Sequence, residues 1–179
     1  MSFIKDNLAT VELQIQQACQ QAKRNRAELT LLAVSKTKPV EMIKQAYLAG
    51  QYAFGESYIQ EAIDKILQLQ NLNHAVWHFI GPIQSNKTKL IAEHFSWVHS
   101  VDRAKIITRL NEHRGNQDTP LNVCLQVNIS EEQTKSGAQI NEIFHLAELV
   151  EQSPNLRLRG LMAIPKKNDS VDSLSLIHI

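Results

Sequence analysis

The sequence predicts an α/β fold in which parallel strands alternate with helices and curve into a TIM-type β/α barrel. Short apolar runs of strand length alternate with segments of helical periodicity along most of the 179 residues. Strands joined by crossover helices lie parallel, and right-handed crossovers in series form either a doubly wound sheet or a barrel. No GxGxxG or GxxxxGKS loop follows any predicted strand, which argues against a nucleotide-binding doubly wound sheet and favours the barrel.

The helices are predicted from apolar residues spaced three and four positions apart. In the first helix this spacing joins Ile4, Leu8 and Val11. A proline in the first turn and a closing glycine bound the second helix, and Asp102 is predicted to cap the fifth. The predicted helices cover residues 4–24, 39–50, 57–69, 85–94, 102–113 and 139–151.

The strands are predicted from short apolar runs that separate these helices. They cover residues 29–35, 52–55, 75–80, 95–101, 121–129 and 156–164. These six strands are two fewer than the eight of a closed barrel. We therefore expect residues 1–165 to form a single partial barrel with an N-terminal helix, followed by an atypical tail over residues 166–179.

The composition is that of an ordinary globular protein without a marked charge. Hydrophobic residues make up 43% of the chain, charged residues 21%, and the formal net charge is +1, so no strong field favours nucleic acid or an anionic membrane. Cys19 and Cys124 lie far apart and fit neither a disulfide framework nor a metal site, which indicates a reducing compartment. Residues 1–6 are too polar for a signal peptide, and no apolar run approaches the length of a membrane span. We expect a cytoplasmic protein that binds no nucleic acid, membrane or metal.

Lys36 is the strongest candidate for a functional residue. It follows the first predicted strand, and the active face of a β/α barrel is built from the carboxyl ends of its strands. Lysine is also the side chain that holds an aldehyde as a Schiff base. The simpler interpretation is a strand-end lysine with its ammonium in water. The other predicted strand ends supply Gly55-Glu56-Ser57, Gly81-Pro82, Ser100-Val101-Asp102, Asn128 and Met162.

Six motifs in order along the chain match a known family. They are Ala33-Val34-Ser35-Lys36-Thr37-Lys38-Pro39, Phe54-Gly55-Glu56-Ser57-Tyr58-Ile59-Gln60-Glu61, Trp77-His78-Phe79-Ile80-Gly81-Pro82-Ile83-Gln84-Ser85-Asn86-Lys87, Val127-Asn128-Ile129-Ser130, Lys135-Ser136-Gly137 and Gly160-Leu161-Met162. Together they resemble the pyridoxal phosphate homeostasis proteins, a family related to the amino-terminal barrel of alanine racemase. The resemblance extends from the first helix to about Pro165.

The resemblance implies a single-domain barrel that binds pyridoxal 5′-phosphate (PLP) through the lysine of the Ser-Lys-Thr-Lys-Pro motif, here Lys36. It implies a non-catalytic role in intracellular vitamin B6 homeostasis, with transient contact with PLP-dependent apoenzymes. A racemase is the alternative, and it needs a second acid–base group, for which Tyr52, Tyr58 or His78 are candidates. A third hypothesis is a cofactor-free Schiff-base aldolase with Glu56 as its base.

The other residues near the expected site carry two interpretations each. Glu56 either approaches the cofactor ring or a substrate amine, or it holds a loop or caps a helix. Lys38 either acts on Lys36 through its positive charge or is a solvated loop lysine, and we expect the latter. Trp77 and Phe79 are expected to pack in the core rather than to form a stacking platform. Ser57 stands where the family usually has asparagine, which puts a ring contact from this position in doubt.

The resemblance ends after Pro165. The family continues with a helix and two strands that carry Gly-Met-Ser and Gly-Ser-Thr…Arg-Ile-Gly segments, which bind the phosphate and face the pyridine nitrogen. Residues 166–179 contain neither segment and are what a C-terminally truncated or frameshifted reading frame would give. We therefore expect this chain to bind PLP weakly, or to fold poorly unless a partner covers the open edge of the barrel.

Overall fold

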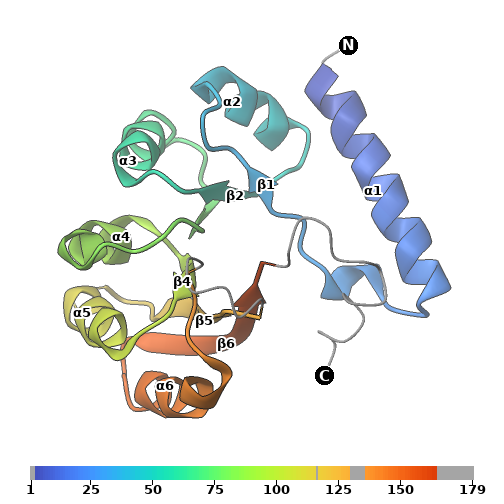
Figure 1. The fold of residues 1–179 in the computed structure, drawn as a ribbon. Coiled ribbons are helices and arrows are strands. Elements are labelled where there is room, and N and C mark those ends of the chain that lie inside the picture. The colour runs from blue at the N-terminus through green and yellow to red at the C-terminus, as the bar shows by residue number, and fades with distance from the viewer. Residues whose placement is uncertain (1–2, 116, 130–135, 165–179) are drawn as a thin grey trace. The chain divides into compact units, whose positions relative to one another are not determined.

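The computed structural model describes residues 3–115, 117–129 and 136–164. The predicted tail, residues 166–179, lies outside the described residues. The chain groups into two compact units, residues 1–79 and residues 80–179, here called the N-terminal and C-terminal units. In each unit, strands and helices alternate along the chain (Figure 1).

The N-terminal unit contains three parallel strands. β1 (Ala33–Val34) pairs with β2 (Ala53–Glu56), and β2 pairs with β3 (Val76–Phe79). The register places Val34 beside Gly55 and Glu56 beside Phe79. Because these strands are parallel, the residues that follow β1 lie at the same edge of the sheet as the end of β2.

β1 is shorter than the predicted strand over residues 29–35. The side chain of Gln51 accounts for part of the difference, because its Nε2 donates hydrogen bonds to the carbonyl oxygens of Leu31 (2.8 Å) and Ala53 (2.6 Å). A side-chain amide therefore binds a carbonyl that a longer ladder would have used. Ser35 still donates its backbone N–H to Gly55 O at 2.9 Å, so the pairing continues to the start of the Lys36 turn.

Among its described residues, the N-terminal unit has three α-helices, α1 (Phe3–Gln21), α2 (Val40–Leu48) and α3 (Ile59–Gln68), and a short 3-10 helix, Arg26–Glu28. α2 begins after Pro39 and is closed by Gly50, whose φ of +93° is left-handed and suits glycine. α2 and α3 lie beside β1 and β2 (Figure 1). The core of this unit is formed by Ile43, Ala46, Phe54, Ala62, Ile63, Leu69, Trp77 and Phe79.

The C-terminal unit repeats the pattern with longer strands. Its elements are α4 (Thr88–His94), β4 (Trp97–Val101), α5 (Ala104–Arg114), β5 (Leu121–Val127), α6 (Ile143–Glu151) and β6 (Leu156–Ala163). β4 pairs with β5 and β5 with β6, all parallel, and the three helices lie on one side of the strands (Figure 1). The prediction of six strands that alternate with helices and run parallel is confirmed for the described residues.

The predicted cap of the fifth helix is wrong. The N-cap of α5 is Arg103, with φ of −161° and ψ of 152°, and no side chain caps this helix. The chain stays extended for one residue beyond Asp102, so the helix begins too late for its carboxylate to reach the first free N–H groups. Asp102 instead accepts a hydrogen bond from the Arg103 guanidinium at 2.6 Å.

Candidate functional site

Lys36 lies on a tight turn directly after β1. The backbone N–H of Lys38 donates to Ser35 O at 3.1 Å and closes the turn, and Lys36 and Thr37 occupy its two central positions. Thr37 has φ of +61°, a left-handed conformation that turns usually give to glycine or asparagine and that is costly for a β-branched residue. The side chain of Lys36 is exposed, so its amine is accessible from solvent.

A buried ion-pair cluster lies beneath this turn. Lys65 of α3 is 5% exposed, and its ammonium donates to Ser35 O (2.8 Å), Glu56 Oε1 (2.9 Å) and Glu61 Oε1 (2.5 Å). These three acceptors use all three hydrogens of the ammonium group. Two carboxylates and a carbonyl therefore compensate a charge that would otherwise be costly to bury.

Glu56 ends β2 and is fully buried. Its Oε1 accepts from the Ser35 hydroxyl at 2.7 Å and from Lys65. Its Oε2 has no hydrogen-bond partner among the described residues. Of the two interpretations of Glu56, the structure places it against the start of the Lys36 turn, where it holds the loop.

Glu61 completes the cluster from the first turn of α3. The hydrogen bond from Lys65 lowers the pKa of the Glu61 carboxyl below its ordinary value of 4.5, and the backbone N–H of Thr37 lowers it further, whereas partial burial opposes both. The Thr37 N–H donates to Glu61 Oε1 at 2.6 Å. The residues on both sides of Lys36 are thus bonded to the cluster.

The sequence did not single out Lys65 or its partnership with Glu61. Lysine on a helix surface is normally solvated, and an i,i+4 Glu–Lys pair usually marks an exposed face. One signal was present, because Lys65 lies three residues after Ala62 and four before Leu69, and both of these apolar residues are buried. A lysine on the apolar face of a helix needs a buried partner, and here the partner is Glu56.

The remaining candidates of the N-terminal unit have structural positions. Lys38 is exposed, as predicted, and lies at one side of an apolar groove of about 260 Å³ between α1, β1 and α2. Trp77 and Phe79 are buried, and the Trp77 ring lies 5.5 Å from the ring of Phe54, which confirms their role in packing. Ser57 is half-buried.

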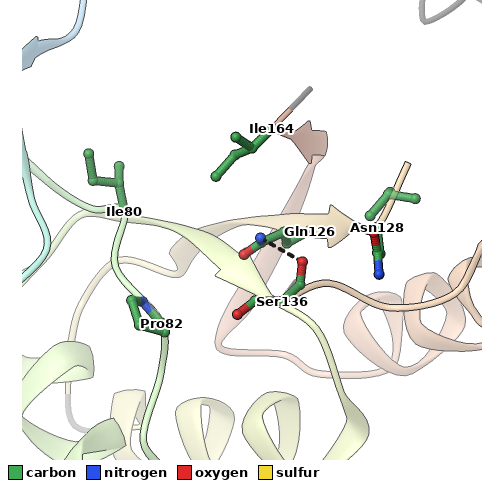
Figure 2. Close-up of a pocket in the computed structure, with 7 residues that line it drawn as sticks. Ile80, Pro82, Gln126, Asn128, Ser136 and Ile164 are labelled. Carbon is green, nitrogen blue, oxygen red and sulfur yellow. Dashed lines mark hydrogen bonds between the residues drawn. The ribbon is translucent and has the colours of Figure 1, made fainter. Parts of the chain in front are cut away.

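In the C-terminal unit, a pocket of about 230 Å³ lies at the carboxyl ends of β5 and β6. Figure 2 shows Ile80, Pro82 and Ile164 on its apolar side and Gln126, Asn128 and Ser136 on its polar side. Asn128, which the sequence placed at a strand end, is 4% exposed. The pocket combines apolar walls with a few amide groups, the usual chemistry of a small-molecule site.

The polar side of this pocket is fixed by a segment that packs on β5. Gln126 Nε2 donates to Ser136 O at 3.0 Å, and the backbone N–H of Asn128 donates to Ala138 O at 3.0 Å. Gly137 has φ of +128°, and a Cβ at this position would lie 2.6 Å from Asn128 N. Only glycine fits this approach, which explains the glycine of the Lys-Ser-Gly motif.

Two other strand-end candidates complete the predicted set. The Ser100 hydroxyl donates to the carbonyl oxygen of Gly81, and Met162 is half-buried in β6.

Among the described residues, no group of three or more histidine, cysteine, aspartate or glutamate side chains could hold a metal ion. Within the same residues, no helix has the length and apolar character needed to cross a membrane.

Comparisons with known proteins identify the family. Residues 7–176 match the family model of the alanine racemase N-terminal domain. The pyridoxal phosphate homeostasis protein of Pasteurella multocida is 56% identical over 169 residues, which cover 94% of this chain and 72% of that protein. The protein of the same name from Pseudomonas aeruginosa is 57% identical over 166 residues, covering 93% and 72%.

Among solved structures, PipY of Synechococcus elongatus with PLP bound is similar to this chain. It superposes with a TM-score of 0.80 at 31% identity, over 97% of this chain and 76% of PipY. The six motifs, the strand–helix order and these relatives agree. The chain belongs to the pyridoxal phosphate homeostasis protein family, whose barrel is that of the alanine racemase N-terminal domain.

Proposed function

We propose that this chain binds PLP, holds it covalently on Lys36, and thereby takes part in intracellular vitamin B6 homeostasis. The observation that carries the proposal is the contrast between two neighbouring lysines. Lys36 is exposed on a fixed turn, whereas Lys65 is buried with its three hydrogens bonded to oxygen acceptors. Of these two lysines, Lys36 is therefore the one whose amine can react with an aldehyde.

The residues of this strand end fit an aldehyde cofactor. PLP supplies an electrophilic aldehyde carbon, and the Lys36 amine forms a C=N bond to it with the release of one water molecule. Lys65 and the two carboxylates keep the turn in place while Lys36 stays accessible. Relatives at 56% and 57% identity carry the name pyridoxal phosphate homeostasis protein, and PipY binds PLP in its solved structure, which supports the choice of cofactor.

The experiment titrates the protein with PLP and then reduces the mixture with borohydride, which converts a C=N bond into a stable secondary amine. Peptide mass spectrometry locates the modified lysine in the wild type, in Lys36→Ala and in Lys38→Ala. At saturating PLP we expect a stoichiometric adduct on Lys36 that disappears in Lys36→Ala and persists in Lys38→Ala, a matched loop lysine. An adduct of equal yield on another lysine in Lys36→Ala would overturn the assignment.

The racemase alternative gains no specific support. It requires an acid–base group opposite the cofactor, and the Tyr52 ring packs edge-on against Tyr47 and His74. We expect no racemisation of alanine or serine by the PLP-loaded protein, and we expect transient transfer of the cofactor to PLP-dependent apoenzymes in the cytoplasm. The expectation of weak binding depends on residues 166–179, outside the described part of the chain, and stays a prediction.

A further inference from the structure

We propose that Lys65 is a positioning residue for Lys36: its buried ammonium, acting through Ser35 and Glu61, fixes the turn that presents the Lys36 amine to an aldehyde. This inference rests on the proposed function, since it concerns the same covalent step. All three hydrogens of the Lys65 ammonium are engaged in the cluster, so Lys65 could react only if these hydrogen bonds broke. It acts only by holding Lys36 in place.

The turn needs such support because its conformation is unfavourable for its own sequence. Thr37 has φ of +61°, where the branched Cβ of threonine crowds the backbone. An unsupported Ser-Lys-Thr-Lys turn would relax toward negative φ at Thr37. Such a relaxation would rotate the peptide that follows Lys36 and so change the direction in which its side chain leaves the turn.

The contacts that oppose this relaxation come from one cluster. Ser35 O, at the first position of the turn, accepts from the Lys65 ammonium at 2.8 Å as well as from Lys38 N–H at 3.1 Å. The Thr37 N–H, at the third position, donates to Glu61 Oε1 at 2.6 Å, and that oxygen is held by Lys65 at 2.5 Å. One ammonium group therefore fixes both residues that flank Lys36.

Burial makes this support rigid. Lys65 is 5% exposed and Glu56 is fully buried, so water cannot replace their hydrogen bonds at low cost. The covalent step needs this rigidity, because the Lys36 nitrogen must approach the aldehyde carbon along a defined direction before the C=N bond forms and water leaves. A displacement of about 1 Å can slow such a step by roughly a hundredfold.

A simple truncation of Lys65 would leave Glu56 buried without a counter-charge, and misfolding would then hide the effect. The test therefore uses the double variant Lys65→Met with Glu56→Gln, which removes both charges and nearly keeps the volume. The control is Lys44→Met, which removes an exposed lysine paired with Glu41 outside the cluster. The Glu61 carboxylate is one-third exposed. Glu61→Ala removes its contact with Thr37 and leaves Lys65 paired with Glu56, so this variant serves if the double variant does not fold.

The measurement is the rate at which PLP forms the borohydride-trapped adduct on Lys36, with thermal unfolding recorded in parallel. We expect the double variant and Glu61→Ala to react about tenfold to a hundredfold more slowly, and we expect Lys44→Met to react near the wild-type rate. Adding Thr37→Gly, which makes positive φ intrinsically accessible, should restore most of the rate without restoring the unfolding temperature. A merely structural role would produce neither the slow step in the folded protein nor this rescue.

The outcomes separate the two proposals. If the wild type forms no adduct on Lys36, the proposed function fails, and this inference fails with it. If the wild type reacts and the folded double variant and Glu61→Ala react at the same rate, only the role of Lys65 is overturned. If the variants are slow and Thr37→Gly does not rescue them, positioning through the turn is overturned as well.

Discussion

The Lys36 turn and the segment at residues 136–138 are both held in place after the end of a strand, but by different kinds of interaction. Each lies at the carboxyl end of a strand, β1 in the N-terminal unit and β5 in the C-terminal unit. The Lys36 turn is held by charged side chains, with Lys65, Glu56 and Glu61 bonded to Ser35 and Thr37. The segment at 136–138 is held by backbone hydrogen bonds, by the uncharged Gln126 amide and by the absence of a side chain at Gly137.

Because the two regions are held by different interactions, they should respond to different substitutions. A charged cluster is sensitive to the loss of one partner, because the partner that stays behind is buried and uncompensated. A backbone contact against glycine is sensitive to added volume and not to charge. Electrostatic changes should therefore act mainly on the Lys36 turn, and steric changes mainly on the segment beside β5.

The largest effect is expected from Lys65→Met alone. It leaves the fully buried Glu56 without its cation, and breaking a buried pair in this way costs about 3–5 kcal/mol in the free energy of unfolding. The matched control is Lys44→Met, whose ion pair with Glu41 at 2.9 Å is exposed and should contribute less than about 1 kcal/mol. Urea denaturation measures both.

The reporter for this comparison is the fluorescence of Trp77, a core residue of the N-terminal unit, in a Trp97→Phe background. The chain has only two tryptophans, so each unit can be followed by its own. Equal losses of stability in Lys65→Met and Lys44→Met would mean that the buried cluster is no more important than a surface pair.

A smaller effect is expected from Gly137→Ala. The new Cβ would lie 2.6 Å from Asn128 N and 2.8 Å from the Val127 carbonyl carbon, so the segment must move away from β5. Overpacking of this kind typically costs about 1–3 kcal/mol. Trp97, in a Trp77→Phe background, reports the unfolding of the C-terminal unit.

The control for Gly137→Ala is Gly160→Ala. Gly160 also has a positive φ, +143°, but a Cβ there meets nothing within 4 Å. Its substitution isolates the backbone strain from the steric clash. If the two variants lose the same stability, the close approach to Asn128 contributes nothing beyond strain.

The fold was largely predictable from the sequence, and so were the positions of Lys36 and Gly137. Helical periodicity and the short apolar runs fixed the order and type of the elements because they report which faces are buried. Gly137 and Lys36 were both found within motifs. The sequence could not reveal the shortening of β1, since that depends on the contact of the Gln51 side chain with Leu31.

The buried cluster of Lys65, Glu56 and Glu61 that holds the Lys36 turn was not predictable, because only the fold brings Ser35 and Glu56 to Lys65. Lys65 contacts Ser35, thirty residues earlier, and Glu56, nine residues earlier. Periodicity places Lys65 near the core of α3, but only the parallel pairing of β1 with β2 brings Ser35 and Glu56 above it. The function of a buried lysine is set by its acceptors, and these emerge only in three dimensions.

The smallest expected effect is a pH dependence at the rim of the cluster. The pKa of Glu61 lies below its ordinary value of 4.5, chiefly because of the Lys65 hydrogen bond, so folding favours the deprotonated carboxyl. Its contribution to stability is therefore fully present above the unfolded pKa and is lost as the pH falls through the lower folded pKa. Since the side chain is one-third exposed, we expect less than about 1 kcal/mol.

Glu61→Gln tests this pH dependence. The difference in the free energy of unfolding between wild type and variant should be greatest near neutral pH and should shrink as the pH falls below about 4.5. Glu12→Gln is the control, because the pKa of Glu12 is also lowered, by an Arg26 guanidinium at a more exposed site. Its effect should fade in about 1 M salt, whereas the effect of Glu61→Gln should persist because the partner ammonium of Lys65 is buried. If the free energies of unfolding of wild type and Glu61→Gln change in parallel across this pH range, the Lys36 turn does not depend on the charge of Glu61. The contrast with the segment at residues 136–138 would then depend on Glu56 and Lys65 alone.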